Sequence, residues 1–271
     1  MLLAIDYNLS GCAGWRRNVV NIVVLVKQVP DTATRIKIAS GGTEIERQGV
    51  NFVVNPYDEF AIEEALRLRE QHQGQVTVLT VGDEKSEEAL RTALAMGADE
   101  AVRVSAAATD SMTTARAIAS VVHGLAPDLV IAGKQAVDDD EGQVGSLVAA
   151  LLDWPQVTVV TKLELKDGTG VAEREVEGGV EIVDFSLPAV ITAQKGLNEP
   201  RYASLPGIMK AKRKEIRQVS VDAKTVGEPT LRTLSLQLPP ERSAGKILSG
   251  MDASSAAKEL VRLLHEEAKL I

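Results

Sequence analysis

The chain has 271 residues, of which 45% are hydrophobic and 25% charged, a composition typical of a folded globular protein. Its 30 Lys and Arg residues against 38 Asp and Glu residues give a formal net charge of −8. This charge argues against duplex nucleic acid as a partner, because basic residues supply most of the affinity for phosphates. The apolar runs are far shorter than the roughly 20 residues that a membrane-spanning helix needs, so we expect no membrane insertion. The single cysteine, Cys12, excludes an internal disulfide and a multi-cysteine metal site, and favours a reducing compartment.

The first twenty residues differ in character from the rest. Asp6 interrupts the apolar stretch that an export signal needs, and no small-residue cleavage site follows residues 16–17. The two arginines at 16–17 could indicate an organellar or twin-arginine address, but Asp6 and the missing periodicity weaken both interpretations. We therefore expect residues 1–20 to be a disordered or mis-started extension in which Cys12 and Trp15 have no function.

From residue 21 onward, apolar β-rich runs alternate with amphipathic helical segments. The predicted strands are 21–28, 75–82, 100–104 and 128–134, and the predicted helices are 55–73, 86–98 and 111–125. Residues 35–48 alternate around paired glycines and predict a short hairpin. Strands that are apolar throughout and alternate with helices predict an α/β fold with a mostly parallel, doubly wound sheet covered on both faces.

The second half of the chain changes pattern. Residues 157–193 contain three β-rich runs separated by turn residues, which predict an antiparallel extension of the same sheet. Residues 219–250 lack any period and predict an extended arm, and an amphipathic helix capped by Asp252 closes the chain. This helix packs either on a partner subunit or back on its own domain. The expected organisation is an extension (1–20), an α/β nucleotide-binding domain (21–218), and a C-terminal arm and helix packing on the partner (219–271).

Three loops are candidates for ligand binding, because ligands of such sheets bind beyond the carboxyl ends of the strands, where the strand order reverses. They follow three predicted strands, at 29–32, 81–86 and 133–145. A fourth candidate is the helix start at 55–58, where Asn55 is expected to cap the helix and Pro56 to occupy its first turn. The same segment could also place unpaired N–H groups and an aromatic ring at the rim of a crevice.

Among these segments, the loop at 133–145 has the most residues that indicate ligand binding. A helix start after it would bind an anion through free backbone N–H groups, but Asp138, Asp139 and Asp140 oppose a phosphate by about 4 kcal/mol each at about 4 Å. If a phosphate binds there, we expect these side chains to turn away as caps while the backbone faces it. A divalent metal bound by the three aspartates is the alternative, although consecutive residues rarely converge on one ion.

Sequence signals of an enzyme are missing. The chain has no GxGxxG, GxxxxGK[ST], GxSxG or HExxH motif. His72, His123 and His265 are scattered on helical segments, and nothing in the sequence groups them into a metal site. Residues 40–43 (SGGT) resemble the SGGxD loop of ATP pyrophosphatases only faintly, and a hairpin turn explains them better. We expect neither a catalytic side chain nor a bound metal.

Several motifs together resemble the beta (small) subunit of electron-transfer flavoproteins. They occur in order at 24–32, 54–70, 92–99, 129–145, 152–156 and 197–214, and residues 172–192 fit a further pattern of that family. The similarity extends from about residue 21 to the C-terminus.

The resemblance implies a heterodimer with an alpha subunit that holds most of the FAD, while the beta subunit buries an AMP. The residues that would contact AMP are Leu25, Asn55, Pro56, Tyr57, Asp58, Val81, Gly133, Lys134, Gln135, Ala136, Val137, Asp138, Asp139, Asp140, Glu141, Gly142, Gln143 and Val144. Tyr57 and residues 29–32 would lie near the flavin ring, although some relatives have an aromatic residue in place of Thr32.

The resemblance also implies a loop that recognises partner dehydrogenases, with Leu205 as its apolar anchor. The residues of this recognition loop are Asn198, Glu199, Pro200, Arg201, Tyr202, Ala203, Ser204, Leu205, Pro206, Gly207, Ile208, Met209 and Lys210. An exposed Leu on a loop braced by prolines suits brief contacts with several partners.

The implied function is that of an electron carrier without catalytic side chains of its own. It would accept electrons from flavin dehydrogenases, such as acyl-CoA dehydrogenases, and pass them to the respiratory chain through a quinone oxidoreductase, in a bacterial cytoplasm or a mitochondrial matrix. Bifurcating relatives bind a second FAD in place of AMP and tend to have a Gly within the Asp run. Asp138–Asp140 here favour the AMP-binding, non-bifurcating type. A further alternative is a stand-alone ATP- or AMP-binding stress or sensor protein.

Overall fold

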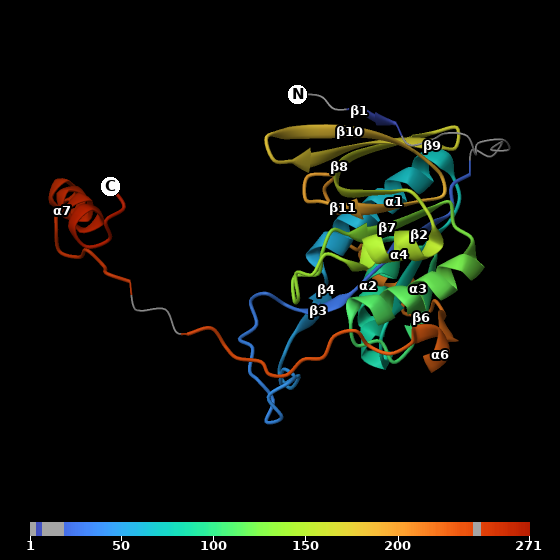
Figure 1. Cartoon of the computed structure of the whole chain (residues 1–271), viewed down its shortest axis with the longest axis horizontal. Coiled ribbons are helices and arrows are strands. Elements are labelled where there is room, and N and C mark those ends of the chain that lie inside the picture. Colours follow the sequence, from blue (N-terminus) through green and yellow to red (C-terminus); the bar gives the residue numbers. More distant parts are fainter. Residues whose placement is uncertain (1–3, 7–18, 241–244) are drawn as a thin grey trace.

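The computed structural model describes residues 4–6, 19–240 and 245–271. Ten strands form the main sheet (Figure 1). Their spatial order is β1 (Ala4–Asp6), β10 (Gly179–Ser186), β9 (Thr169–Val176), β8 (Gln156–Lys166), β11 (Ala189–Ala193), β7 (Leu129–Gly133), β2 (Ile22–Leu25), β5 (Val76–Val81), β6 (Glu100–Ser105) and β12 (Ile216–Ser220). From β8 to β12 all neighbours are parallel, whereas β8, β9 and β10 pair antiparallel. The predicted α/β fold with a mostly parallel sheet is therefore confirmed.

Helices cover both faces of the parallel part. The helices are α1 (Pro56–His72), α2 (Glu87–Met96), α3 (Ser111–Leu125), α4 (Val144–Leu152), α5 (Leu205–Ala211), α6 (Ala223–Val226) and α7 (Ala253–Glu266), with a 3-10 turn at Glu84–Ser86. Side chains of β2 alternate between two cores: Ile22 and Val24 pack with α1 and α2, while Val23 and Leu25 pack with α3 and α4. This is why the strand is apolar at every position.

The order of the strands reverses at β2. The chain passes from β2 to β5 and β6 on one side, and then crosses over to β7 and β11 on the other. The carboxyl ends of β2 and β7 therefore flank the switch point, where ligands bind in sheets of this kind.

Two predicted β segments differ from expectation. The predicted hairpin at 35–48 is reduced to an isolated bridge between Ile38 and Ile45, while a small separate sheet pairs β3 (Gln28–Pro30) with β4 (Phe52–Val54). The antiparallel extension forms as predicted, but its end becomes a fourth strand, β11, whose five residues are all buried. Burial on both faces explains why β11 inserts between β7 and β8 instead of continuing the antiparallel sheet.

The arm starts later than position 219. The strand β12 extends the main sheet, and α6 follows it with Val226 only 1% exposed against α3. The arm proper begins after Gly227, because burial of Val226 fixes the preceding residues on the α/β body. The final helix, α7, is capped by Asp252 as predicted, has no buried residue, and stands clear of the body in Figure 1.

Part of the N-terminal extension is built into the sheet. Residues Ala4–Asp6 form β1, which pairs in parallel with Ile182–Asp184 of β10. Val20 is buried in the core beside β2, so the body begins slightly before residue 21. Cys12 and Trp15 lie outside the described residues. In the part of the chain that is described, we find no helix long and apolar enough to cross a membrane.

Candidate functional site

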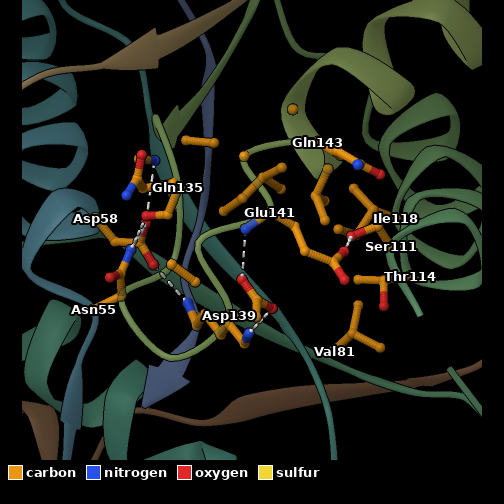
Figure 2. A pocket seen from close by; sticks show the side chains of 18 of the residues that line it. Asn55, Asp58, Val81, Ser111, Thr114, Ile118, Gln135, Asp139, Glu141 and Gln143 are labelled. Atoms are coloured by element: carbon orange, nitrogen blue, oxygen red, sulfur yellow. Dashed lines mark hydrogen bonds and ion pairs between the residues drawn. The ribbon is translucent and has the colours of Figure 1, made fainter. Parts of the chain in front are cut away.

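A cavity of about 350 Å³ opens at the carboxyl edge of the sheet, where β2 and β7 diverge (Figure 2). The ends of β2, β5 and β7 line it, together with the starts of α3 and α4. Its apolar lining includes Leu25, Val81 and Ile118, and polar groups come from the loops. Ligand pockets usually measure about 300–1,000 Å³, so the cavity suits one small molecule.

Asp58 ties three elements together at this cavity. Its carboxylate is 5% exposed and accepts hydrogen bonds from Lys27 N at 2.7 Å, Asn55 Nδ2 at 2.9 Å and Gly133 N at 3.1 Å. Burial raises the pKa of Asp58 to about 7, although the three donors favour the ionised form. The bonds join the end of β2, the start of α1 and the end of β7.

Position 133 requires a glycine because the end of β7 approaches the start of α1 closely. A Cβ at this position would lie 2.4 Å from Asp58 Oδ1 and 2.8 Å from the backbone carbon of Tyr57. Any larger residue would therefore push the end of β7 away from α1.

Asn55 holds the loop after β7 as well as the start of its own helix. It occupies the N-cap position of α1 as predicted, and Pro56 the first turn, but the Asn55 side chain makes no cap hydrogen bond. The Asn55 side chain instead donates to Gln135 O at 2.9 Å and accepts from Val137 N at 3.2 Å. The side chain makes these contacts because Asn55 is only 1% exposed, and a buried amide must find hydrogen-bond partners within the protein.

The aspartates after β7 are held by a lysine. Lys27 Nζ lies 2.8 Å from Asp138 Oδ1 and 2.7 Å from Asp139 Oδ2, and Asp140 accepts from Gln135 Nε2 at 2.6 Å. Burial acts to lower the pKa of Lys27, but the two aspartates outweigh it and hold that pKa above its ordinary value.

These contacts correct the expectation that the aspartates act as helix caps. Helix α4 begins at Val144, with Gln143 as its N-cap residue and no side-chain cap, so its first backbone N–H groups are available to an anion. Among the described residues, no group of three His, Cys, Asp or Glu side chains could hold a metal ion.

Most of the residues predicted to contact a nucleotide meet at the cavity. Those that line it are Leu25, Asn55, Asp58, Val81, Gly133, Lys134, Gln135, Ala136, Asp139, Glu141, Gly142, Gln143 and Val144. Five predicted residues do not line it: Pro56, Tyr57, Val137, Asp138 and Asp140. Tyr57 instead stacks under Lys134, whose Nζ lies 5.0 Å from the ring centroid.

The prediction from sequence missed one wall of the cavity. The loop from Ala108 to Ser111 lines the cavity together with Thr114 and Ile118 of α3. In Figure 2, Ser111, Thr114 and Ile118 lie across the cavity from Asn55 and Asp58. Because this loop follows β6, the rule that selected the other carboxyl-end loops could have found it as well.

The loop expected near a flavin is partly buried. Val29 is fully buried in β3, whereas Thr32 is exposed beyond the strand. Asp31 fixes the turn by accepting from Ala33 N at 2.9 Å and Asn51 Nδ2 at 3.2 Å.

The recognition loop is anchored on α1 at its beginning. Asn198 Nδ2 donates to Phe60 O and to Glu64. Arg201 binds Glu63 through Nε at 2.8 Å and Nη2 at 3.0 Å. Partial burial acts to raise the pKa of Glu63, but Arg201 outweighs it and holds that pKa below its ordinary value.

The end of the recognition loop becomes α5 and exposes apolar side chains. Ser204 caps α5 by accepting from Gly207 N at 3.1 Å. Tyr202 is 98% exposed and Leu205 79% exposed, with Met209 exposed one turn further along α5. A rigid base that presents bare apolar groups is suited to contact another protein.

Fold and site define an α/β protein with a ligand-sized crevice at the switch point of a doubly wound sheet. Residues 43–224 match the model of the electron transfer flavoprotein domain. The chain is 45% identical over 259 residues to the electron transfer flavoprotein subunit beta of Bacillus subtilis (strain 168), covering 93% of this chain and 100% of that protein. It is also 44% identical over 257 residues to the mitochondrial electron transfer flavoprotein subunit beta of Oryza sativa subsp. japonica (92% and 99%). To the electron transfer flavoprotein subunit beta of Homo sapiens it is 39% identical over 250 residues (89% and 98%).

The chain therefore belongs to the beta subunits of the electron transfer flavoprotein family, and the resemblance noted from its motifs is confirmed. This membership identifies it as part of a flavoprotein that transports electrons.

Proposed function

We propose that this chain binds one AMP in the crevice between β2 and β7 and assembles with an alpha subunit that holds most of an FAD. The observation that carries the proposal is the crevice itself, which combines an apolar lining with the free N–H groups at the start of α4. An adenine ring suits Leu25, Val81 and Ile118, and a phosphate suits the start of α4.

The charge of the crevice supports an anionic ligand. Lys27 offsets the charge of Asp138 and Asp139, and the Asp140 carboxylate is engaged by Gln135. The repulsion expected from three free aspartates is thereby reduced. Gly133 and Gly142 both line the cavity, where a glycine presents backbone without a side chain.

The size of the crevice favours AMP over the second FAD of bifurcating relatives. A volume of about 350 Å³ is at the lower end for ligand pockets, and the Asp138–Asp140 run has no Gly. A stand-alone nucleotide sensor is disfavoured because the arm exposes Leu231, Leu234 and Leu238, a costly arrangement for a chain that works alone.

In this proposal, a bound flavin would supply the redox chemistry of a carrier between a dehydrogenase and a quinone oxidoreductase. The chain contributes a wall that excludes water from the flavin and a docking surface around Leu205. The proposal assigns no catalytic role to any side chain among the described residues. The proposed compartment is a bacterial cytoplasm or a mitochondrial matrix.

Cofactor content tests the proposal directly. The isolated chain should be colourless, and coexpression with its alpha subunit should give a yellow complex with about one FAD and one AMP per pair. A self-sufficient chain that hydrolyses ATP and recruits no flavin-bearing partner would overturn it.

The docking role of Leu205 is tested by Leu205→Ala. We expect unchanged FAD and AMP content and a raised KM of a partner dehydrogenase for the complex, by roughly tenfold for one lost hot spot of 1–2 kcal/mol. Leu151→Ala is the matched control, because Leu151 is an exposed leucine on α4, away from the recognition loop. Loss of AMP in Leu205→Ala, or an equal effect of both variants, would refute the role.

A further inference from the structure

The C-terminal arm and the helix α6 just before it are attached to the rest of the chain at three successive points. Arg116 of α3 donates to Val226 O at 3.2 Å. Next, Thr230 and Leu231 bind the Asp110 carboxylate. Finally, Leu236 N donates to Gly42 O at 2.7 Å, where the arm passes the loop between β3 and β4 in Figure 1. The arm therefore leaves the body along a defined path.

Asp110 is the central attachment, and its two oxygens serve different elements. One oxygen, Oδ1, accepts from Thr113 N at 2.8 Å and so caps α3. The other, Oδ2, accepts from Thr230 Oγ1 at 2.7 Å, from Leu231 N at 3.0 Å and from Thr230 N. Together these donors hold the pKa of Asp110 well below its ordinary value, despite a partial desolvation that acts to raise it.

The same residue forms part of the cavity wall. Asp110 and its neighbours Thr109 and Ser111 all line the crevice. Ser111 also hydrogen-bonds to Glu141, which belongs to the loop after β7 and lies beside Ser111 in Figure 2. Ser111 follows Asp110 directly in the chain, and Asp110 Oδ2 binds the arm. A shift of the crevice wall at Ser111 is therefore transmitted to Asp110 and from there to the arm.

We propose that Asp110 is a positioning residue that pins the root of the C-terminal arm to the wall of the nucleotide crevice, and so links filling of the crevice to seating of the arm on the partner subunit. This inference rests on the proposed function for the two ligands it names, AMP and the alpha subunit. A nucleotide that fixes the 109–111 wall fixes the direction in which residues 230–236 leave the body. By linkage, each ligand then strengthens binding of the other by the same factor.

The chemistry of one substitution separates the two roles of Asp110. In Asp110→Asn the amide oxygen still accepts from Thr113, and Asn is as good an N-cap as Asp. The amide nitrogen, however, cannot accept from Leu231 N or Thr230 N. The variant therefore keeps α3 and weakens the central attachment of the arm, while the attachments at Val226 and Leu236 remain.

The experiment measures the dissociation constant of the alpha–beta pair with saturating AMP and without nucleotide. For the wild type we expect AMP to tighten the pair by a factor in the range of about 5–150 that is typical of coupled sites. In Asp110→Asn this factor should fall toward 1, and Thr230→Val, which removes only one of the three donors, should lower it by less. Asp222→Asn is the matched control, because Asp222 caps α6 through Thr225 N and does not line the crevice.

Three results would decide against the inference. An unchanged factor in Asp110→Asn would show that the arm and the crevice are independent. An equal fall in Asp222→Asn would assign the effect to the arm's general stability. Complete loss of AMP binding in Asp110→Asn would make Asp110 a nucleotide contact and not a tether. By contrast, failure of the wild type to bind AMP or an alpha subunit would overturn the proposed function itself.

Discussion

Replacement of Gly133 by Ala tests how the crevice is held open. The added methyl would lie 2.4 Å from Asp58 Oδ1, 2.7 Å from Tyr57 Cβ and 2.8 Å from the Tyr57 backbone carbon. A rotamer change cannot relieve the last of these contacts, because it involves backbone at the start of α1. The loop must move, which stretches the bond between Gly133 N and Asp58, now 3.1 Å.

The expected cost follows from two contributions. Overpacking of a close-packed site costs about 1–3 kcal/mol, and weakening a buried hydrogen bond to a carboxylate adds about 1–2 kcal/mol. We therefore expect Gly133→Ala to lower the free energy of unfolding by about 2–5 kcal/mol. AMP content should fall as well, because the loop from Gly133 to Gly145 lines the crevice.

Urea unfolding and nucleotide analysis of the purified pair measure both effects. Gly124→Ala is the matched control, since Gly124 lies in α3 with nothing within 4 Å of an added Cβ. That variant should gain up to about 1 kcal/mol from helix propensity. If Gly133→Ala is as stable as the wild type and keeps its AMP, the close approach of β7 to α1 is not what shapes the site.

Three further outcomes follow from the contacts of the site. Asp58 has a pKa of about 7 in the folded chain against an ordinary 3.8, so between these pH values the native state binds a proton that the unfolded state has lost. The free energy of unfolding should therefore fall by as much as about 4 kcal/mol from pH 4 to pH 7. Urea unfolding should show a smaller dependence on pH in Asp58→Asn, and an unchanged dependence would contradict the assignment. Lys27→Met should change the free energy of unfolding by no more than about 1 kcal/mol, because its ion pairs are half-exposed. It should lower the affinity for AMP about tenfold, because it leaves the charges of two aspartates without a counterion. Unaltered affinity in calorimetry would exclude this role of Lys27. Asn55→Ala should release the loop at Gln135 and Val137 and lower stability by about 2–4 kcal/mol, whereas a loss below 0.5 kcal/mol would show that other contacts hold the loop.

The crevice and the recognition loop share one helix. The start of α1 supplies Asn55 and Asp58 to the crevice, and its middle supplies Glu63 and Glu64 to the recognition loop. A single rigid element thus fixes the distance between the proposed nucleotide and the proposed docking surface. Its buried acidic residues are explained by these partners, since a buried carboxylate without a donor would be costly.

The sequence by itself determined the elements and their class. Runs such as 128–134 are apolar on both faces, and a strand with that pattern must be covered by helices on each side. Capping residues also fixed local boundaries: Asp252 begins α7 as predicted, because a helix end must satisfy its own backbone groups nearby. The rule that ligands bind beyond the carboxyl ends of parallel strands also identified most of the crevice loops from the sequence alone.

Only the tertiary structure decided which polar side chains meet. Lys27 and Asp139 are 112 positions apart, Asp110 and Thr230 are 120 apart, and nothing local in either segment indicates its partner. Asn55 has the sequence context of a helix cap, yet its buried amide also binds Gln135, 80 residues away in the sequence. Local sequence fixes backbone hydrogen bonding within a few residues, whereas the pairing of buried polar groups depends on how the strands are ordered in the sheet, and that order is set by the packing of the whole chain.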